Sequence, residues 1–264
     1  MTNVEENMMW EQPPTPKRVL VTGSTGAIGE PLCRYLTARG HHVRGFARRP
    51  SAFLDDYVMG DLNDQEKVRT AVQGMDVVVH LGAYPNPADF TTVLLQPNVL
   101  GPYFVLEAAV EFGVPRVVLA STVQVITGHG NLGRPVRVDD GPKPVNHYAL
   151  TKAWMEQMGD MYARVHNLSV ICVRIGWLPR NLDEARVLAA HPYGRDTFFS
   201  HNDSNRFHTL CVEAPAPAPG QCAILHAASK PVTVSRMDLT NARTVIGYEP
   251  EDVWPDGLPF DVDL

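Results

Sequence analysis

The 264-residue sequence has few cysteines, no long apolar run and no basic run. Its four cysteines lie far apart among apolar residues and none has C-x-x-C spacing, which is typical of buried, reduced thiols and predicts a cytoplasmic protein. No stretch of 18 apolar residues could form a transmembrane helix. The net charge of −6, without a Lys/Arg-rich run, predicts neither a nucleic-acid partner nor a membrane partner.

Several catalytic signatures are also absent. None of the ten histidines forms H-x-x-x-H or H-E-x-x-H, so we expect no metal site. There is no G-x-S-x-G, which argues against serine hydrolysis. No glycine loop ends in Lys followed by Ser or Thr, which argues against phosphoryl transfer of the ATPase type.

What is present is a regular alternation of strand and helix signals. The runs Val77–Val79 and Val117–Leu119 are continuously apolar, as in central strands buried on both faces. We therefore predict an α/β fold, a Rossmann-type doubly wound parallel sheet. The expected strands are Arg18–Thr22, His42–Ala47, Asp76–Leu81, Arg116–Ala120 and Ser169–Ile175, and the expected helices are Ile28–Arg39, Glu66–Gln73, Val93–Phe112 and Tyr148–His166.

The sequence predicts a short leader followed by one large domain. Residues 1–16 hold three acidic residues and three prolines without the basic and apolar regions of a signal peptide, so we expect a flexible leader. Residues 17–264 are expected to form one NAD(P)-binding domain. Within it, residues 177–264 should contribute most of a short substrate cap. The proline-rich segment Glu213–Gly220 is expected to be a surface loop.

Three glycines follow the first expected strand directly: Gly23, Gly26 and Gly29. In a strand-to-helix turn they would allow a tight turn, a close approach of backbone N–H groups to a pyrophosphate, and helix–strand packing. The spacing is G-x-x-G-x-x-G, and glycines also serve ordinary turns. Their place at the first such turn nevertheless favours a dinucleotide.

The end of the second strand predicts which dinucleotide is bound. An acidic residue there selects NAD, whereas arginine accommodates the 2′-phosphate of NADP. This chain has Arg48 and Arg49 and no carboxylate at this point, which favours NADP, with NAD possible. The alternative is that the arginines are only solvated. Asp61 and Leu62 follow a further extended stretch and are placed to bind the adenine.

Tyr148 and Lys152 lie four residues apart at the start of an expected helix, so their side chains share one face. A lysine charge there would lower the pKa of the phenol toward neutrality, as a proton donor and acceptor requires. Ser121 and Thr122 end the preceding strand and offer hydroxyls to a substrate oxygen.

These residues resemble the extended short-chain dehydrogenase/reductase family, the NAD-dependent epimerase/dehydratase-like group, over roughly residues 18–180. The resemblance implies that Tyr148 is the general acid/base, that Lys152 binds the ribose, and that Thr122 replaces the usual serine. The motifs that carry it are Thr22-Gly23-x-x-Gly26-x-x-Gly29, Asp61-Leu62, His80-Leu81-Gly82-Ala83, Asn98-Val99-x-Gly101, Ala120-Ser121-Thr122, Tyr148-x-x-x-Lys152 and Arg174-Ile175-Gly176. The implied cofactor-binding set is Gly23, Thr25, Gly26, Ala27, Ile28, Arg48, Arg49, Asp61, Leu62, Leu81, Gly82, Ala83, Asn98, Lys152 and Ile175.

Within that family the chain is most similar to the uronate dehydrogenase-like subgroup. By this resemblance Arg186 occupies the place of the arginine that binds the substrate carboxylate. Pro85, Val123 and Trp177 stand where that subgroup presents polar groups, so we expect a pocket that satisfies sugar hydroxyls poorly. The expected substrate-binding residues are Pro85, Ser121, Val123, Trp177 and Arg186.

The sequence thus predicts an NADP-preferring oxidoreductase that moves hydride between the nicotinamide and a carbonyl or alcohol carbon of a small substrate that is not highly hydroxylated. Two alternatives stay open: a nucleotide-sugar epimerase or dehydratase with retained cofactor, and a non-catalytic NADP-sensing protein. The resemblance also implies a homodimer, joined through the helices that span about Val99–Phe112 and Tyr148–His166.

Overall fold

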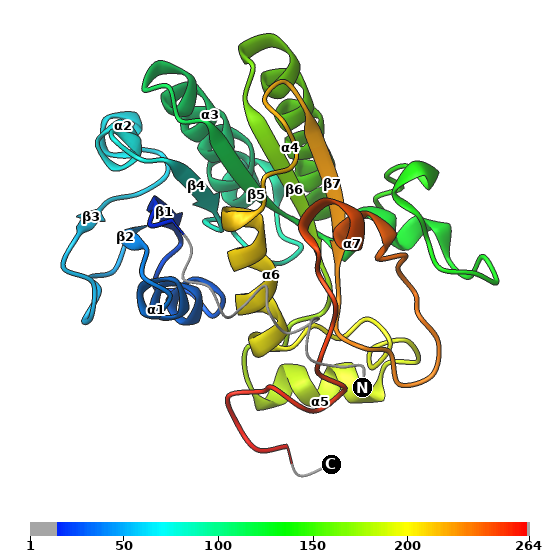
Figure 1. The fold of residues 1–264 in the computed structure, drawn as a ribbon. Coiled ribbons are helices and arrows are strands. Elements are labelled where there is room, and N and C mark those ends of the chain that lie inside the picture. The colour runs from blue at the N-terminus through cyan, green and yellow to red at the C-terminus, as the bar shows by residue number, and fades with distance from the viewer. Residues whose placement is uncertain (1–14, 263–264) are drawn as a thin grey trace, which may run out of the picture.

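The computed structural model describes residues 15–262, and their centre is a seven-stranded sheet in which all neighbouring strands are parallel. The strand order is β3-β2-β1-β4-β5-β6-β7 (Figure 1). This arrangement confirms the predicted Rossmann-type α/β fold. The strands are β1 (Arg18–Thr22), β2 (His42–Ala47), β3 (Tyr57–Met59), β4 (Val77–His80), β5 (Arg116–Thr122), β6 (Ser169–Ile175) and β7 (Cys222–Ala227). The expected leader falls almost wholly outside the described residues.

Helices cover both faces of the sheet. One apolar cluster joins one face to α1, α6 and α7, and a second joins the other face to α2, α3 and α4. Buried strands such as β5 are therefore apolar on both sides, which explains their continuous apolar runs. The helices are α1 (Gly29–Ala38), α2 (Gln65–Val72), α3 (Gly101–Glu111), α4 (His147–His166), α5 (Leu182–Ala190), α6 (His201–Glu213) and α7 (Thr240–Ile246).

The long helix expected over 93–112 is interrupted. Two wide turns, Phe90–Leu94 and Gln96–Leu100, precede α3. The N–H of Leu95 donates to Phe90 O and that of Gly101 to Gln96 O, each five residues back. Pro97 has no N–H to donate, so a regular ladder of bonds four residues back is broken within this segment.

The last third of the chain contains elements that the sequence pattern did not predict, namely α5, α6, β7 and α7. In α6 the polar side chains Asp203, Ser204 and His208 are buried along with Phe207. Buried polar residues remove the apolar periodicity by which a helix is detected. The loop expected over Glu213–Gly220 begins one residue later, because Glu213 ends α6, and its Pro217 carbonyl accepts hydrogen bonds from Arg116 and Ser169.

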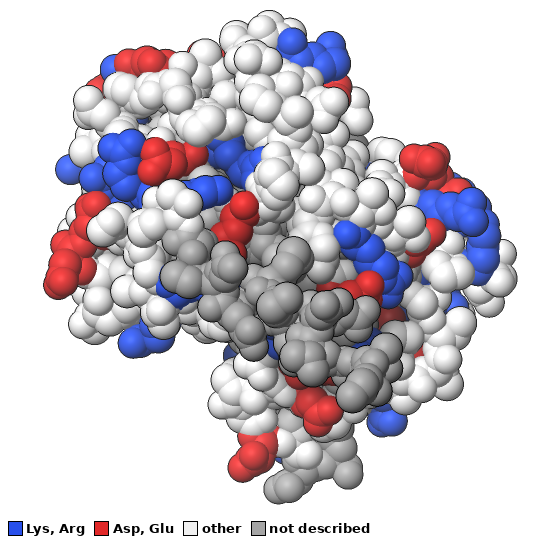
Figure 2. All heavy atoms as spheres, viewed as in Figure 1, with Lys and Arg blue, Asp and Glu red and all other residues white. Residues whose placement is uncertain are grey.

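α5 lies beyond the carboxyl end of β6, where it packs in a small separate cluster with Phe198 and Trp254 (Figure 1). Residues after 177 therefore complete the sheet through β7 and also build this cluster. On the face shown in Figure 2, basic and acidic side chains are interspersed and do not gather by sign. No helix within residues 15–262 is long and apolar enough to cross a membrane.

Candidate active site

Two adjoining cavities of about 820 and 880 Å³ lie at the carboxyl ends of the central strands. The smaller extends over the glycine loop, and the larger extends from β5 and α4 to the segments around α5 and before α7. In open α/β sheets this edge is where ligands bind. The residues that line both cavities are Ile28, Leu81, Ala83, Pro85, Ala120 and Arg180.

The glycine loop forms the floor of the smaller cavity. Gly23 has φ +69° and donates its N–H to Phe46 O at 2.8 Å. A Cβ at Gly29 would stand 2.2 Å from Gly23 O, so a side chain there would push the loop open. Thr25, Gly26 and Ala27, which lie between these two glycines in the sequence, line the cavity. This close-packed turn at a helix start suits a pyrophosphate, and the residues present fit a dinucleotide.

The far end of the smaller cavity carries the residues expected to choose the dinucleotide. Arg48, Arg49, Asp61 and Leu62 all line it. Both arginines are exposed, and Arg49 donates to Thr25 O at 2.9 Å, which brings its guanidinium against the glycine loop. Neither forms an ion pair with an acidic side chain within residues 15–262.

The three expected catalytic residues all line the larger cavity, and none of them lines the smaller. Asn146 caps α4 by accepting a hydrogen bond from Ala149 N at 2.8 Å, which fixes the helix start that carries Tyr148. Thr122 ends β5 and is hydrogen bonded to Tyr148. Lys152, one turn along α4, is buried and donates to Ala120 O at 2.8 Å. A hydroxyl, a phenol and an ammonium thus face one space.

Electrostatics at these groups follow from burial. Burial raises the pKa of Tyr148, while the hydrogen bond with Thr122 and the charge of Arg180 lower it. Burial lowers the pKa of Lys152 to about 8. The sequence expectation gave Lys152 the role of lowering the Tyr148 pKa. In the structure the charge of Arg180 acts on the pKa of Tyr148 in that direction.

Asn98 has a positioning role in this structure. It is buried, lines neither cavity, accepts from Tyr84 N at 2.8 Å and donates to Tyr84 O at 3.0 Å. These bonds hold the loop after β4, and that loop supplies Leu81, Gly82 and Ala83 to the cofactor cavity.

Of the expected substrate-binding residues, Pro85, Ser121, Val123 and Trp177 line the larger cavity. Ile175, expected at the cofactor, lines this cavity only. Ser121 donates to Glu156 at 2.6 Å, so its hydroxyl is engaged within the core and Thr122 is the hydroxyl next to Tyr148.

Arg186 is the exception. It lines neither cavity, its side chain is 56% exposed, and it pairs with Asp183 at 3.3 Å on the outer side of α5. The expected placement of this arginine at the substrate is therefore not what the structure shows. The helical repeat directs it away, because Ala185 and Leu188 take the buried face of α5.

Two other arginines border the larger cavity. Arg180 forms hydrogen bonds with Glu184 at 2.9 Å and with Asn86 at 3.2 Å. Arg236, on the loop between β7 and α7, stacks on the ring of Tyr193. Sequence reasoning missed both, since neither lies in a motif. Position 180 could have been suspected only because it closely follows Arg174-Ile175-Gly176.

Comparisons with known proteins add the following. A model described as the NAD dependent epimerase/dehydratase family matches residues 19–178. The L-arabinose 1-dehydrogenase (NAD(P)(+)) of Haloferax volcanii is 32% identical over 252 residues, covering 89% of this chain and 96% of that protein.

Two solved structures are similar throughout the fold. Glucuronic acid dehydrogenase from Chromohalobacter salexigens has a TM-score of 0.78 at 26% identity, covering 90% of this chain and 86% of that one. A mutant uronate dehydrogenase from Agrobacterium tumefaciens, complexed with NAD, has a TM-score of 0.76 at 28% identity, with the same coverage. These similarities confirm the resemblance that the sequence motifs indicated.

Proposed function

The chain belongs to the NAD dependent epimerase/dehydratase family and is an NAD(P)-dependent enzyme, and from that premise we propose that it transfers hydride between the nicotinamide and a carbonyl or alcohol carbon of a small substrate, with NADP preferred. The observation that carries this proposal is the meeting of Thr122, Tyr148 and Lys152 in the larger cavity, beside Ala120, which lines both cavities.

The protein's own groups have distinct tasks. A nicotinamide held over the glycine loop would supply the hydride-transfer chemistry. In the oxidative direction Tyr148 takes the hydroxyl proton of the substrate, and in the reductive direction it returns a proton to the carbonyl oxygen. Thr122 donates a hydrogen bond to the same oxygen, where charge develops. Lys152 is held by Ala120 O and would bind the ribose of the cofactor.

The preference for NADP rests on Arg48 and Arg49. Both line the cofactor cavity without an acidic partner in the described chain, and no acidic side chain ends β2. A 2′-phosphate would supply the negative charge with which these guanidinium groups can pair. NAD is the alternative cofactor, since it is the one bound in the related uronate dehydrogenase structure.

The larger cavity favours a substrate with few hydroxyls. Many of its polar side chains are bonded within the protein: Ser121 to Glu156, Asn146 to Gln124 at 3.0 Å, and Asn86 to Arg180. Much of the rest of the lining is apolar, including Val123, Ile126, Val136, Leu178 and Met237. Unpaired sugar hydroxyls in such a cavity would lose their bonds to water without replacement.

A sugar dehydrogenase is the second candidate function. One relative that is similar along nearly its whole length is named for L-arabinose, and two structural neighbours are named for uronates. An epimerase or dehydratase that retains its cofactor is a third reading within the same family.

The test is a substrate panel. Purified protein is mixed with NADPH and aldehydes, ketones and oxo acids, and with NADP⁺ and alcohols, L-arabinose and glucuronate, while the absorbance of reduced nicotinamide is followed. We expect turnover with the sparsely hydroxylated compounds and its loss in Tyr148→Phe. Full turnover in Tyr148→Phe would overturn the proposed mechanism. Tightly retained cofactor without net absorbance change would instead favour the epimerase reading.

We also propose a cytoplasmic homodimer. The four cysteines are free, which suits a reducing compartment. Exposed apolar side chains on α3 and α4, Tyr103, Trp154, Met161 and Val165, fall on the helices expected to join two copies. Burying them in a four-helix contact would remove apolar surface from water.

A further inference from the structure

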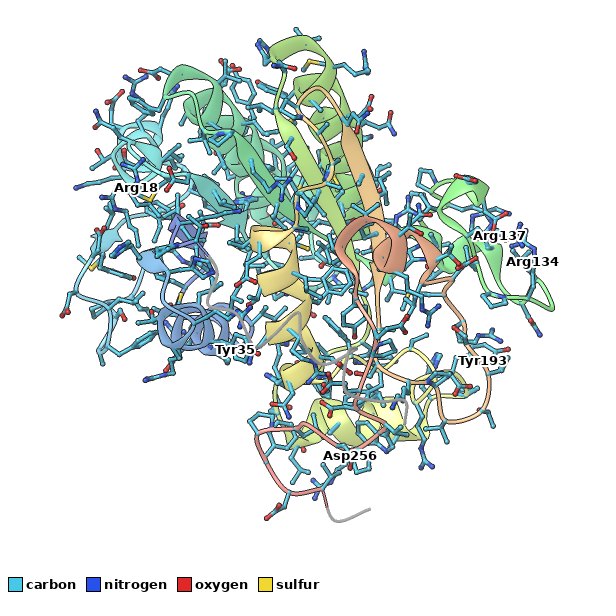
Figure 3. All side chains as sticks on the ribbon, viewed as in Figure 1. Arg18, Tyr35, Arg134, Arg137, Tyr193 and Asp256 are labelled. Atoms are coloured by element: carbon cyan, nitrogen blue, oxygen red, sulfur yellow. The ribbon has the colours of Figure 1, made fainter. Side chains whose placement is uncertain are left out.

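One wall of the substrate cavity is a row of rings that ends at a cation. The ring centroids of Trp177 and His191 lie 5.4 Å apart, and those of His191 and Tyr193 lie 6.0 Å apart. The guanidinium carbon of Arg236 lies 3.7 Å from the centroid of the Tyr193 ring. All four residues line the same cavity as Thr122 and Tyr148. Figure 3 shows Tyr193 beside the loop that carries Arg236.

Arg236 is held in place by its backbone and by this ring. Its carbonyl accepts a hydrogen bond from Val136 N at 3.0 Å, within a short parallel pairing of Val136 with Met237. Stacking on Tyr193 fixes the plane of the guanidinium and leaves its edge, where the N–H donors are, open to a ligand.

The charge of Arg236 has no acidic counterpart in residues 15–262. The nearby carboxylates are engaged elsewhere: Asp238 with Arg137 and Thr240, and Asp196 with Thr233. Glu184, the acidic residue of the cavity lining, bonds with Arg180. The cavity therefore has an excess of positive charge although the chain as a whole is acidic.

Building on the proposed function, we propose that Arg236 binds a carboxylate of the substrate, whose apolar part lies along the rings of Trp177, His191 and Tyr193. The substrate class is then an oxo acid or hydroxy acid with an apolar body. A carboxylate fits one guanidinium by two parallel hydrogen bonds. A dianionic phosphate would need a second cation, and Arg180 is already neutralised by Glu184.

Binding can be measured without turnover. The probes are 3-phenylpropionate and its neutral amide, 3-phenylpropionamide, together with benzoate and 4-methylpentanoate and their amides, titrated calorimetrically into protein saturated with NADP⁺. We expect carboxylates to bind at least about 10-fold more tightly than their amides, as charge-assisted hydrogen bonds provide. In Arg236→Met this preference should vanish, while the affinity for NADP⁺ should not change.

A matched control is Arg195→Met, which removes an exposed arginine near the same wall that does not line the cavity. It should keep the full preference for carboxylates. Arg236→Lys should keep part of it, because the charge remains and the planar fork is lost.

The outcomes separate this inference from the proposed function. Carboxylates that bind no better than amides, that fail to bind, or that bind equally to Arg236→Met would overturn it, even if the enzyme reduces neutral ketones. Binding that depends on Arg236, without turnover of any carbonyl or alcohol compound, would support the carboxylate site and count against the proposed reaction.

Discussion

Glu156 of α4 accepts hydrogen bonds from Arg174 of β6 at 2.9 and 2.8 Å, with both side chains 1% exposed. The same carboxylate accepts from Ser121 at the end of β5. The Glu156 carboxylate therefore ties α4, which carries Tyr148 and Lys152, to β6 through the ion pair. Through Ser121 it also ties α4 to the end of β5, which carries Thr122. The motif Arg174-Ile175-Gly176 contributes to the site through this support.

Removing one partner of this pair should destabilise the protein strongly. Glu156→Ala leaves the Arg174 guanidinium buried without its anion, and breaking such a pair costs about 3–5 kcal/mol. Chemical denaturation followed by circular dichroism measures the change in the free energy of unfolding. Glu66→Ala, whose carboxylate is 85% exposed, is the control and should change it by less than about 0.5 kcal/mol. Equal effects of the two variants would contradict the supporting role of the pair.

Thr122 should contribute through its hydroxyl alone. Thr122→Val keeps the shape but removes the donor, and loss of one donor to a developing oxyanion lowers kcat by about 10²–10³. Thr122→Ser restores the hydroxyl and should retain most of the activity. Steady-state kinetics on a substrate found in the panel would compare them. If Thr122→Val kept the kcat of the parent protein, Ser121 or another group would have to polarise the substrate oxygen.

Arg48 and Arg49 should set the preference between cofactors. The double change to serine removes both charges beside the expected 2′-phosphate, so the Kd for NADP⁺ should rise at least about 10-fold while that for NAD⁺ stays nearly constant. Fluorescence titration measures both. Arg164→Ser, at an exposed pair on α4 outside both cavities, is the control. An unchanged ratio of the two affinities would leave NAD as the better assignment.

The homodimer proposal predicts a change in mass. Val165 is 61% exposed and Trp154 is 43% exposed on α4, and Trp154→Glu with Val165→Glu would place charges in the expected helix contact. Light scattering at micromolar concentration should give twice the chain mass for the parent protein and a lower average for the double variant. A monomer mass for the parent protein would disprove the proposal.

The sequence predicted well where local pattern and tertiary role agree. β1, β2 and β6 have the expected boundaries, because breakers flank them and, in β1 and β6, an apolar run is buried on both faces. The glycine turn and Tyr148-x-x-x-Lys152 were also recognisable, because the spacing of their residues along the chain already determines how those residues lie in space. Arg180, Tyr193 and Arg236 were not, because loops bring them together from far apart in the chain. The orientation of Arg186 depends on which face of α5 is buried, and no motif records that.

Acid should destabilise the protein through its buried histidines. Burial lowers the pKa of His80 to about 3 and those of His208 and His226 to about 4, from an ordinary value of 6.5. Between these values the unfolded chain binds more protons than the folded chain, so the free energy of unfolding falls as pH falls from 6.5 toward 4. Each histidine can contribute a slope of up to about 1.4 kcal/mol per pH unit.

Urea denaturation at several pH values between 7 and 4 would measure that slope. His208 donates from Nδ1 to Ser204 O at 2.8 Å, with Ser204 Oγ 3.4 Å from the same nitrogen, and its Nε2 is buried without a partner in the described structure. His208→Phe should therefore reduce the slope while costing little at pH 7, because a ring is kept and a buried polar atom is lost. His42→Phe, at an exposed site, should leave the slope unchanged. A slope that His208→Phe does not alter would mean that His208 is not among the groups whose protonation drives acid unfolding.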